Sequence, residues 1–353
     1  MWLVNRMPSY RRLHSRIYLV EYLRGLAALS VAWFHLTNQY AAGISPARIS
    51  GSYGWLGVEV FFVISGFVIP LSLAKLQTRY TLRQFPQFMV RRVLRLEPPY
   101  LISVALVIFL WLISALFPFF KGAPFEFNFG QIFAHLFYLV PLTDFDWLQP
   151  VYWSLAWEFI FYIVMGLIFP TVGRDDQNLT WCIAAIAVGL LTVLGFLPIR
   201  VLLFIIGVAL YRVELVSSSI REDQKVQLVS NLIVILISGL IISREDMQIA
   251  LVAISAAGLI HLFRRYEAPF FLHRWLIRLG ACSYSLYLTH IPIGGRIVNL
   301  GRRFIDGALS EFILSMFALL VCLVFAWLFM LVVERPAIAL SKTLGRNPLE
   351  SVV

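Results

Sequence analysis

The sequence predicts an all-α membrane protein with about ten transmembrane helices and one short re-entrant or interfacial helix. Three observations lead to this prediction. Hydrophobic residues make up 60% of the 353 residues and charged residues only 14%, whereas soluble domains are about 45–50% apolar and about 25% charged. Apolar runs of roughly 20 residues, long enough to cross a hydrocarbon core of ~30 Å as a helix, recur along the chain. Lys and Arg gather in alternate loops, which is typical of membrane proteins.

The apolar runs define ten predicted spans, and no hydrophilic stretch between them is long enough for a separate soluble domain. We therefore expect a single membrane domain over residues 1–353. A further apolar piece at 130–141 ends at Pro141 and is too short to cross, so we expect a re-entrant or interfacial helix packed against protein. We place the spans at 17–40, 54–74, 98–118, 150–170, 180–197, 199–216, 226–243, 247–263, 281–298 and 311–333.

The N-terminal segment has basic residues before its first apolar run, as a signal peptide does. However, the run contains Glu21 and Arg24, which the apolar part of a signal peptide would tolerate poorly. We therefore expect a retained first span after a cytoplasmic tail of about residues 1–16. With this orientation, 21 of the 29 Lys and Arg fall in inside loops and 7 in outside loops. The positive-inside rule then predicts ten crossings and a cytoplasmic C-terminal tail, about 335–353.

The Lys and Arg residues of these loops account for the formal net charge of +10. Outside the spans there is no basic face interleaved with aromatic residues, so we expect no nucleic acid partner. The cysteines all lie in apolar segments and are too scattered for a metal site or a disulfide framework, so we expect buried thiols and no metal. These cysteines are Cys182, Cys282 and Cys322.

Ionisable residues inside the predicted spans are costly and therefore indicate function. In the first span, Arg24 and His35 are eleven residues apart, which places them on one helix face about 16 Å apart along the axis. Glu21 lies on the same stripe and can pair with Arg24. The alternatives are a simple intrahelical pair for Glu21 and Arg24, and an interhelical hydrogen bond for His35.

Other spans place ionisable groups from the middle of the membrane outward. Glu59 and Glu158 lie in the outer halves of the second and fourth spans, and His290 lies near the middle of the ninth. An aromatic belt explains Trp153 but not the neighbouring carboxylate. His290 has an equally good alternative, which is a bond to a carbonyl freed by Pro292 in a kinked helix.

Arg91, Arg92 and Arg95 precede the third span on its inner side. Clustered guanidinium groups bind phosphates through bidentate hydrogen bonds, and anchoring to lipid headgroups is the alternative. In this arrangement the arginines lie on the cytoplasmic side of the membrane, and the histidines and carboxylates lie deeper in it. It would suit an anionic donor that enters from the cytoplasm and reaches a proton-transfer site.

Six motifs in chain order resemble acyltransferase family 3, membrane-bound O-acyltransferases that modify bacterial surface and secreted glycans and antibiotics. They run from near residue 20 to residue 336, so the resemblance covers nearly the whole chain. The motifs are Arg24 with His35, the run Gly57–Phe67, Arg91-Arg92-x-x-Arg95, Trp153-Ser154-Leu155-x-x-Glu158-x-x-Phe161-Tyr162, Ser283-Tyr284-Ser285-Leu286-Tyr287-Leu288-x-His290-x-Pro292, and Glu334-x-Pro336.

The resemblance implies ten helices in the bacterial plasma (inner) membrane, acetyl-CoA or another acyl-CoA as donor, and a glycan hydroxyl as acceptor. It implies that His35 is catalytic, either deprotonating the hydroxyl or carrying the acyl group, and imidazole suits both roles. Glu59 and Glu158 would orient His35, as a carboxylate does in a catalytic triad. The expected acyl-CoA ligands are Arg24, Arg91, Arg92 and Arg95. The expected substrate ligands are Trp153, Ser154, Tyr162, Tyr284 and His290.

The sequence therefore predicts an O-acyltransferase that acts on a cell-surface or secreted saccharide. Acetyl is the expected acyl group. Some family members carry a fused extracytoplasmic domain, which we do not expect in this chain. The alternative function is a membrane exporter or transporter of a glycan or acylated compound without chemistry. A purely structural scaffold would not explain the charges inside the spans.

Overall fold

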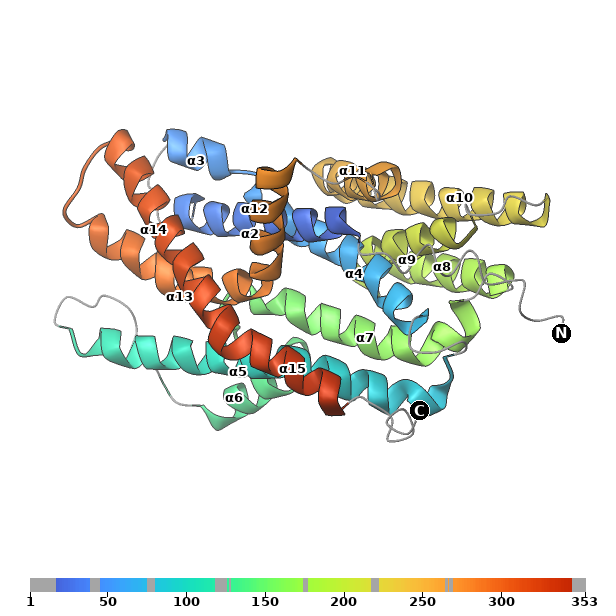
Figure 1. Ribbon diagram of the computed structural model, residues 1–353, viewed down its shortest axis with the longest axis horizontal. Coiled ribbons are helices and arrows are strands. Elements are labelled where there is room, and N and C mark those ends of the chain that lie inside the picture. Colours follow the sequence, from blue (N-terminus) through green and yellow to red (C-terminus); the bar gives the residue numbers. More distant parts are fainter. Residues whose placement is uncertain are drawn as a thin grey trace. The chain divides into compact units, whose positions relative to one another are not determined.

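A computed structural model describes residues 17–38, 45–74, 80–117, 126, 128–173, 177–216, 222–263, 266 and 269–344. Every regular element in these ranges is helical (Figure 1), which confirms the all-α prediction. The predicted N-terminal tail at 1–16 lies outside the described residues, and so does the last part of the predicted C-terminal tail, from residue 345.

Each predicted span coincides with a helix. This agreement arises because a run of apolar residues long enough to span a membrane satisfies its backbone hydrogen bonds as a helix. The helices are α2 (Tyr18–Asn38), α4 (Gly57–Ala74), α5 (Phe85–Ala115), α7 (Tyr152–Val172), α8 (Asn178–Val193), α9 (Val201–Val216), α10 (Glu222–Glu245), α11 (Met247–Phe263), α13 (Ser283–Gly301) and α14 (Ala308–Phe329).

Within the described residues, five helical stretches are long and apolar enough to cross a membrane, and they make the chain an integral membrane protein. The helices α8 and α11 are apolar but shorter; a helix of 16 residues is about 24 Å long. The count of ten crossings therefore stays a prediction. The five stretches are Pro46–Ala74, Leu82–Ala115, Tyr152–Val172, Gln224–Glu245 and Ala308–Thr343.

The third predicted span began too late. The helix α5 starts at Phe85 and continues through Pro98 and Pro99. Proline disfavours the helical conformation in the residue before it, which is why the sequence pattern indicated a boundary there. The three clustered arginines consequently lie within a continuous helix, with Arg91 and Arg95 about one turn apart on the same face.

A short helix is present where the sequence predicted one, as α6 (Phe129–Leu136), followed by a 3-10 turn at Val140–Leu142. Its re-entrant or interfacial position stays a prediction. Two other helices were not predicted, α3 (Pro46–Gly51) and α12 (Phe270–Ala281). In α12 the apolar residues are interrupted by arginines, so its sequence resembled a basic loop. The last span also continues beyond its predicted end, through a π-helical turn at Met330–Glu334 into α15 (Arg335–Leu344).

The helices form two compact units. Unit 1 comprises Met1–Ala27, Leu56–Pro86 and Phe161–Gly280, and unit 2 comprises Ala28–Trp55, Gln87–Ile160 and Ala281–Val353. In unit 2, α13 packs extensively against α14. The prediction of a single membrane domain stays a prediction.

Glycines bring helices of unit 1 into backbone contact. The helices α4 and α9 pack closely, and a Cβ added to Gly207 would lie 2.3 Å from the carbonyl oxygen of Val63. The unpredicted helix α12 packs against the first part of α2, where a Cβ on Gly280 would lie 2.3 Å from the carbonyl oxygen of Glu21. Such small-residue contacts are typical of helices that pack inside membranes.

Candidate functional site

Two histidines are neighbours in unit 2. His35 comes from α2 and His290 from α13, and their ring centroids are 5.2 Å apart with the planes tilted by 41°. His290 is fully buried, and His35 is half-buried. The sequence predicted both histidines deeper in the membrane than the arginines, and the structure brings their rings together.

The proton of His290 can be assigned from its surroundings. Its Nδ1 lies 2.9 Å from the carbonyl oxygen of Leu286. A carbonyl oxygen only accepts hydrogen bonds, so Nδ1 carries the proton and, in the neutral ring, Nε2 holds a lone pair. This carbonyl is not the one that Pro292 frees, which belongs to Leu288, four residues before the proline. The predicted bond of His290 to a helix carbonyl is therefore present, but the carbonyl is that of Leu286.

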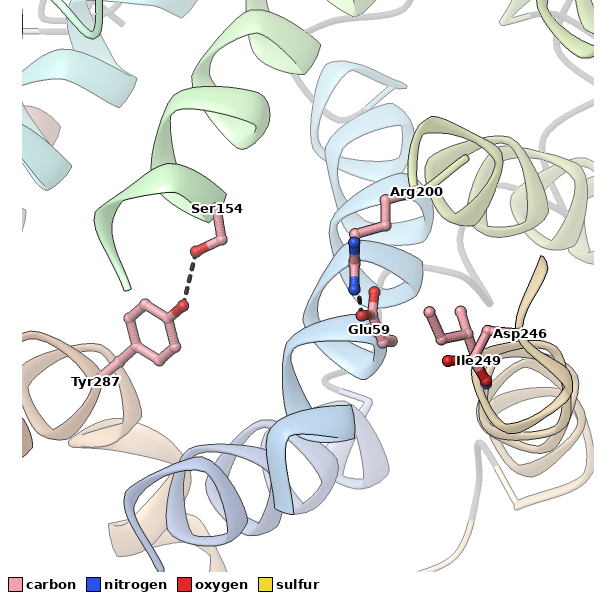
Figure 2. Close-up of polar contacts among 6 residues, drawn as sticks. All are labelled: Glu59, Ser154, Arg200, Asp246, Ile249 and Tyr287. Carbon is pink, nitrogen blue, oxygen red and sulfur yellow. Dashed lines mark hydrogen bonds and ion pairs between the residues drawn. The ribbon is translucent and has the colours of Figure 1, made fainter. Parts of the chain in front are cut away.

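The first turn of α7 lies beside the same part of α13 (Figure 2). The hydroxyls of Ser154 and Tyr287 are 2.7 Å apart and share a hydrogen bond. The carbonyl of Val151 lies 3.0 and 3.1 Å from them and accepts from the hydroxyl that does not donate to the other. The ring of Tyr287 is 6.0 Å from that of His290. Ser154 therefore ties the start of α7 to the helix that carries His290, and its predicted contact with substrate stays a prediction.

Three more predicted residues lie on α7. Glu158 is one helical turn after Ser154, on the same side of the helix, and both Glu158 and Trp153 are half-buried. Tyr162 is 4% exposed and belongs to unit 1. Their roles in orienting His35 or in binding substrate stay predictions.

The arginine cluster is connected to α13 through Tyr284. The Tyr284 hydroxyl donates a hydrogen bond to the carbonyl of Leu96, at 3.0 Å, next to Arg95 in α5. Arg92 stacks over the ring of Phe88, 5.4 Å from its centroid. Because Tyr284 and His290 are six residues apart, this link lies about 9 Å from the histidine along α13.

Glu59 and Arg24 belong to unit 1. Glu59 is 1% exposed and accepts a hydrogen bond from Nε of Arg200 at 2.8 Å (Figure 2). We did not predict this ion pair, because Arg200 resembled an ordinary cation in an outer loop. Arg24 is half-buried on α2. The predicted orientation of His35 by Glu59 stays a prediction.

A second buried carboxylate lies in the π-helical turn of unit 2. Glu334 is 3% exposed and accepts a hydrogen bond from Ser285 at 2.6 Å. π-Helical turns inside helices are frequent at functional sites. Both residues belong to the motifs found in the sequence, but their pairing was not predicted because the motifs are far apart in the chain.

The described ranges contain no group of three or more His, Cys, Asp or Glu side chains that is arranged to hold a metal ion. Cys282 and Cys322 are buried, as the sequence predicted, whereas Cys182 is half-buried.

Comparisons with known proteins agree with the motifs. A family model described as an acyltransferase domain matches residues 17–331. The O-acetyltransferase OatA of Staphylococcus aureus is 25% identical over 348 residues, which cover 86% of this chain and 54% of that protein. The peptidoglycan O-acetyltransferase OatA of Listeria monocytogenes is 32% identical over 97 residues, 27% of this chain and 14% of that protein.

The chain thus spans about half the length of the curated relatives that it matches. No solved structure matches it.

Proposed function

We propose that this chain, which belongs to the acyltransferase family whose model spans residues 17–331, transfers an acyl group to a hydroxyl of a cell-surface or secreted saccharide. The observation that carries the proposal is the neighbouring pair His35 and His290 in unit 2, which supplies an imidazole base inside a membrane domain. The relatives are O-acetyltransferases, which favours acetyl as the acyl group. We also propose that the protein lies in the bacterial plasma (inner) membrane with both termini in the cytoplasm. The proposed donor is acyl-CoA.

The reaction needs one proton acceptor. In the direct route, His35 takes the proton of the acceptor hydroxyl, whose oxygen attacks the thioester carbonyl. The C–S bond breaks as the C–O ester bond forms, and the proton passes from His35 to the CoA thiolate. In the alternative route, the acyl group moves first to His35 and then to the hydroxyl, with the same net balance. Rapid quenching followed by mass spectrometry of the peptide that contains His35 separates the two routes.

Other residues complete the proposed site. Glu59 and Glu158 would orient the base or stabilise its charged form. Arg24 and the arginines of α5 would bind the nucleotide and pyrophosphate of acyl-CoA by charge-assisted hydrogen bonds. The proposed substrate ligands are Trp153, Ser154, Tyr162 and Tyr284.

The arginine cluster gives a prediction on donor binding. The double variant Arg91→Gln/Arg95→Gln should bind acetyl-CoA about 10²- to 10⁴-fold more weakly, because it loses two charge-assisted hydrogen bonds that contribute about 1.5–3 kcal/mol each. The wild-type affinity should also fall as salt increases. Calorimetry on protein in nanodiscs measures both effects, and Arg83→Gln, an exposed arginine just before α5, is the control. An unchanged affinity of the double variant would mean that these arginines only anchor the protein to lipid headgroups.

The function itself is tested by looking for a covalent product. Purified protein in nanodiscs is incubated with acetyl-CoA and a panel of lipopolysaccharide, capsular polysaccharide, exopolysaccharide, oligosaccharide and macrolide acceptors, which are then analysed by mass spectrometry. The proposal expects one acceptor to gain an acetyl ester only when protein is present. If the protein moves a glycan across vesicles and no acceptor is acylated, the transporter alternative is correct.

A further inference from the structure

Two fully buried histidines of unit 2 allow an internal comparison. In His135, Nδ1 is 2.8 Å from the carbonyl of Gln131, and in His290, Nδ1 is 2.9 Å from the carbonyl of Leu286. Each carbonyl belongs to the residue four positions earlier in the chain. Both rings, when neutral, therefore carry their proton on Nδ1 and a lone pair on Nε2.

The second nitrogen distinguishes the two histidines. Nε2 of His135 accepts the backbone N–H of Leu148 at 3.0 Å, so all its hydrogen-bonding capacity serves the fold. Nε2 of His290 is buried, and no residue in the described part of the chain donates to it. Buried polar atoms are nearly always hydrogen-bonded, and an exception calls for a functional explanation. The neighbouring ring is that of His35, with centroids 5.2 Å apart.

We propose that His290 is a positioning residue for His35, and that in the active protein the neighbouring His35 ring turns so that one of its N–H groups donates a hydrogen bond to Nε2 of His290. This inference rests on the proposed function. Two neutral imidazoles share a hydrogen bond only when one donates and the other accepts. Because the Leu286 carbonyl makes His290 the acceptor, His35 is the donor, and its other nitrogen keeps the lone pair.

This arrangement defines the reactive nitrogen of His35. The nitrogen that faces away from His290 takes the hydroxyl proton or the acyl group, and the N–H that faces His290 stays in place. When His35 becomes positively charged, Nε2 of His290 stabilises it, as the third group of a catalytic triad does. A neutral imidazole thus takes the orienting role that the sequence analysis gave to carboxylates.

Two substitutions separate a hydrogen-bonding role from a packing role. His290→Gln keeps an acceptor oxygen near the position of Nε2, whereas His290→Leu fills similar volume without an acceptor. We expect kcat to fall about 100-fold or more in His290→Leu and to recover at least about tenfold in His290→Gln, with KM for acetyl-CoA nearly unchanged in both. Equal kcat values in the two variants would overturn the proposal, and so would a change confined to KM, which would indicate substrate binding. Matched His135→Gln and His135→Leu variants should show no such split in kcat.

A second measurement does not depend on activity or on the folding of a variant. In wild-type protein labelled with 15N-histidine in nanodiscs, NMR should show His290 protonated at Nδ1 and non-protonated at Nε2, with one protonated nitrogen of His35 in a hydrogen bond. His135 serves as the internal reference, because it has the same tautomer. A proton on Nε2 of His290 would overturn the inference even if the protein transfers acetyl groups. The expected tautomers in a protein without transferase activity would support the hydrogen bond and overturn the proposed function.

Discussion

Replacing His35 by Ala should lower the rate of acyl transfer by about 10²- to 10⁴-fold, the usual contribution of a positioned acid–base group. The loss is expected in either chemical route, because both use the lone pair of His35. In the direct route this lone pair takes the proton of the acceptor hydroxyl, and in the other route it attacks the acyl carbon. Transfer of radiolabelled acetyl from acetyl-CoA, measured on protein in nanodiscs, gives the rate.

The control for this experiment is another histidine. His261 lies on α11, is paired with Glu214 at 2.7 Å and has 42% of its side chain exposed, and it has no role in the proposed reaction. His261→Gln should keep nearly wild-type activity. If His35→Ala kept more than about a tenth of the wild-type rate, the contribution of His35 would lie below the range of general acid–base catalysis, and the mechanism would be wrong.

The second large effect concerns stability. Gly207→Ala should lower the free energy of unfolding by about 3 kcal/mol, at the upper end of the range for overpacked sites. The added Cβ would lie 2.3 Å from the carbonyl oxygen of Val63 and 2.7 Å from backbone atoms of Gly66, so two helix backbones must move apart. The thermal unfolding temperature in detergent, followed by intrinsic fluorescence, should fall by several degrees.

A matched glycine in the same unit provides the control. Gly258 lies in α11, and a Cβ added there meets no atom within 4 Å. Gly258→Ala should leave the unfolding temperature unchanged or raise it, because Ala is favoured over Gly in a helix by about 1 kcal/mol. Equal stability of Gly207→Ala and wild type would show that α4 and α9 separate without cost.

The contact between α4 and α9 also involves the buried carboxylate Glu59. Glu59 lies in the first turn of α4, and Arg200 immediately precedes α9. The 2.8 Å ion pair between them therefore depends on how closely these helices pack. Glu59 is 1% exposed whereas 37% of the Arg200 side chain is exposed, and a buried charge is costly unless it is paired, so a shift between the two helices should destabilise this carboxylate.

The sequence by itself determined the all-α class and the positions of the main helices. An apolar run long enough to cross a bilayer must satisfy its backbone hydrogen bonds internally, whatever its neighbours are, so hydropathy is a local and sufficient signal. The same locality explains why the ionisable residues inside spans, such as His35 and His290, were recognised as candidate site residues without a structure.

Only the tertiary structure decided which of these residues meet. The pairs His35–His290 and Ser154–Tyr287 join helices that are distant in sequence, and helix periodicity does not say which faces touch. The start of α5 and the existence of α12 were also decided by packing, since local propensity indicated a boundary at the prolines and a basic loop at the arginines. The tautomer of His290, on which the positioning of His35 depends, follows from a carbonyl of its own helix and from the burial that surrounds it.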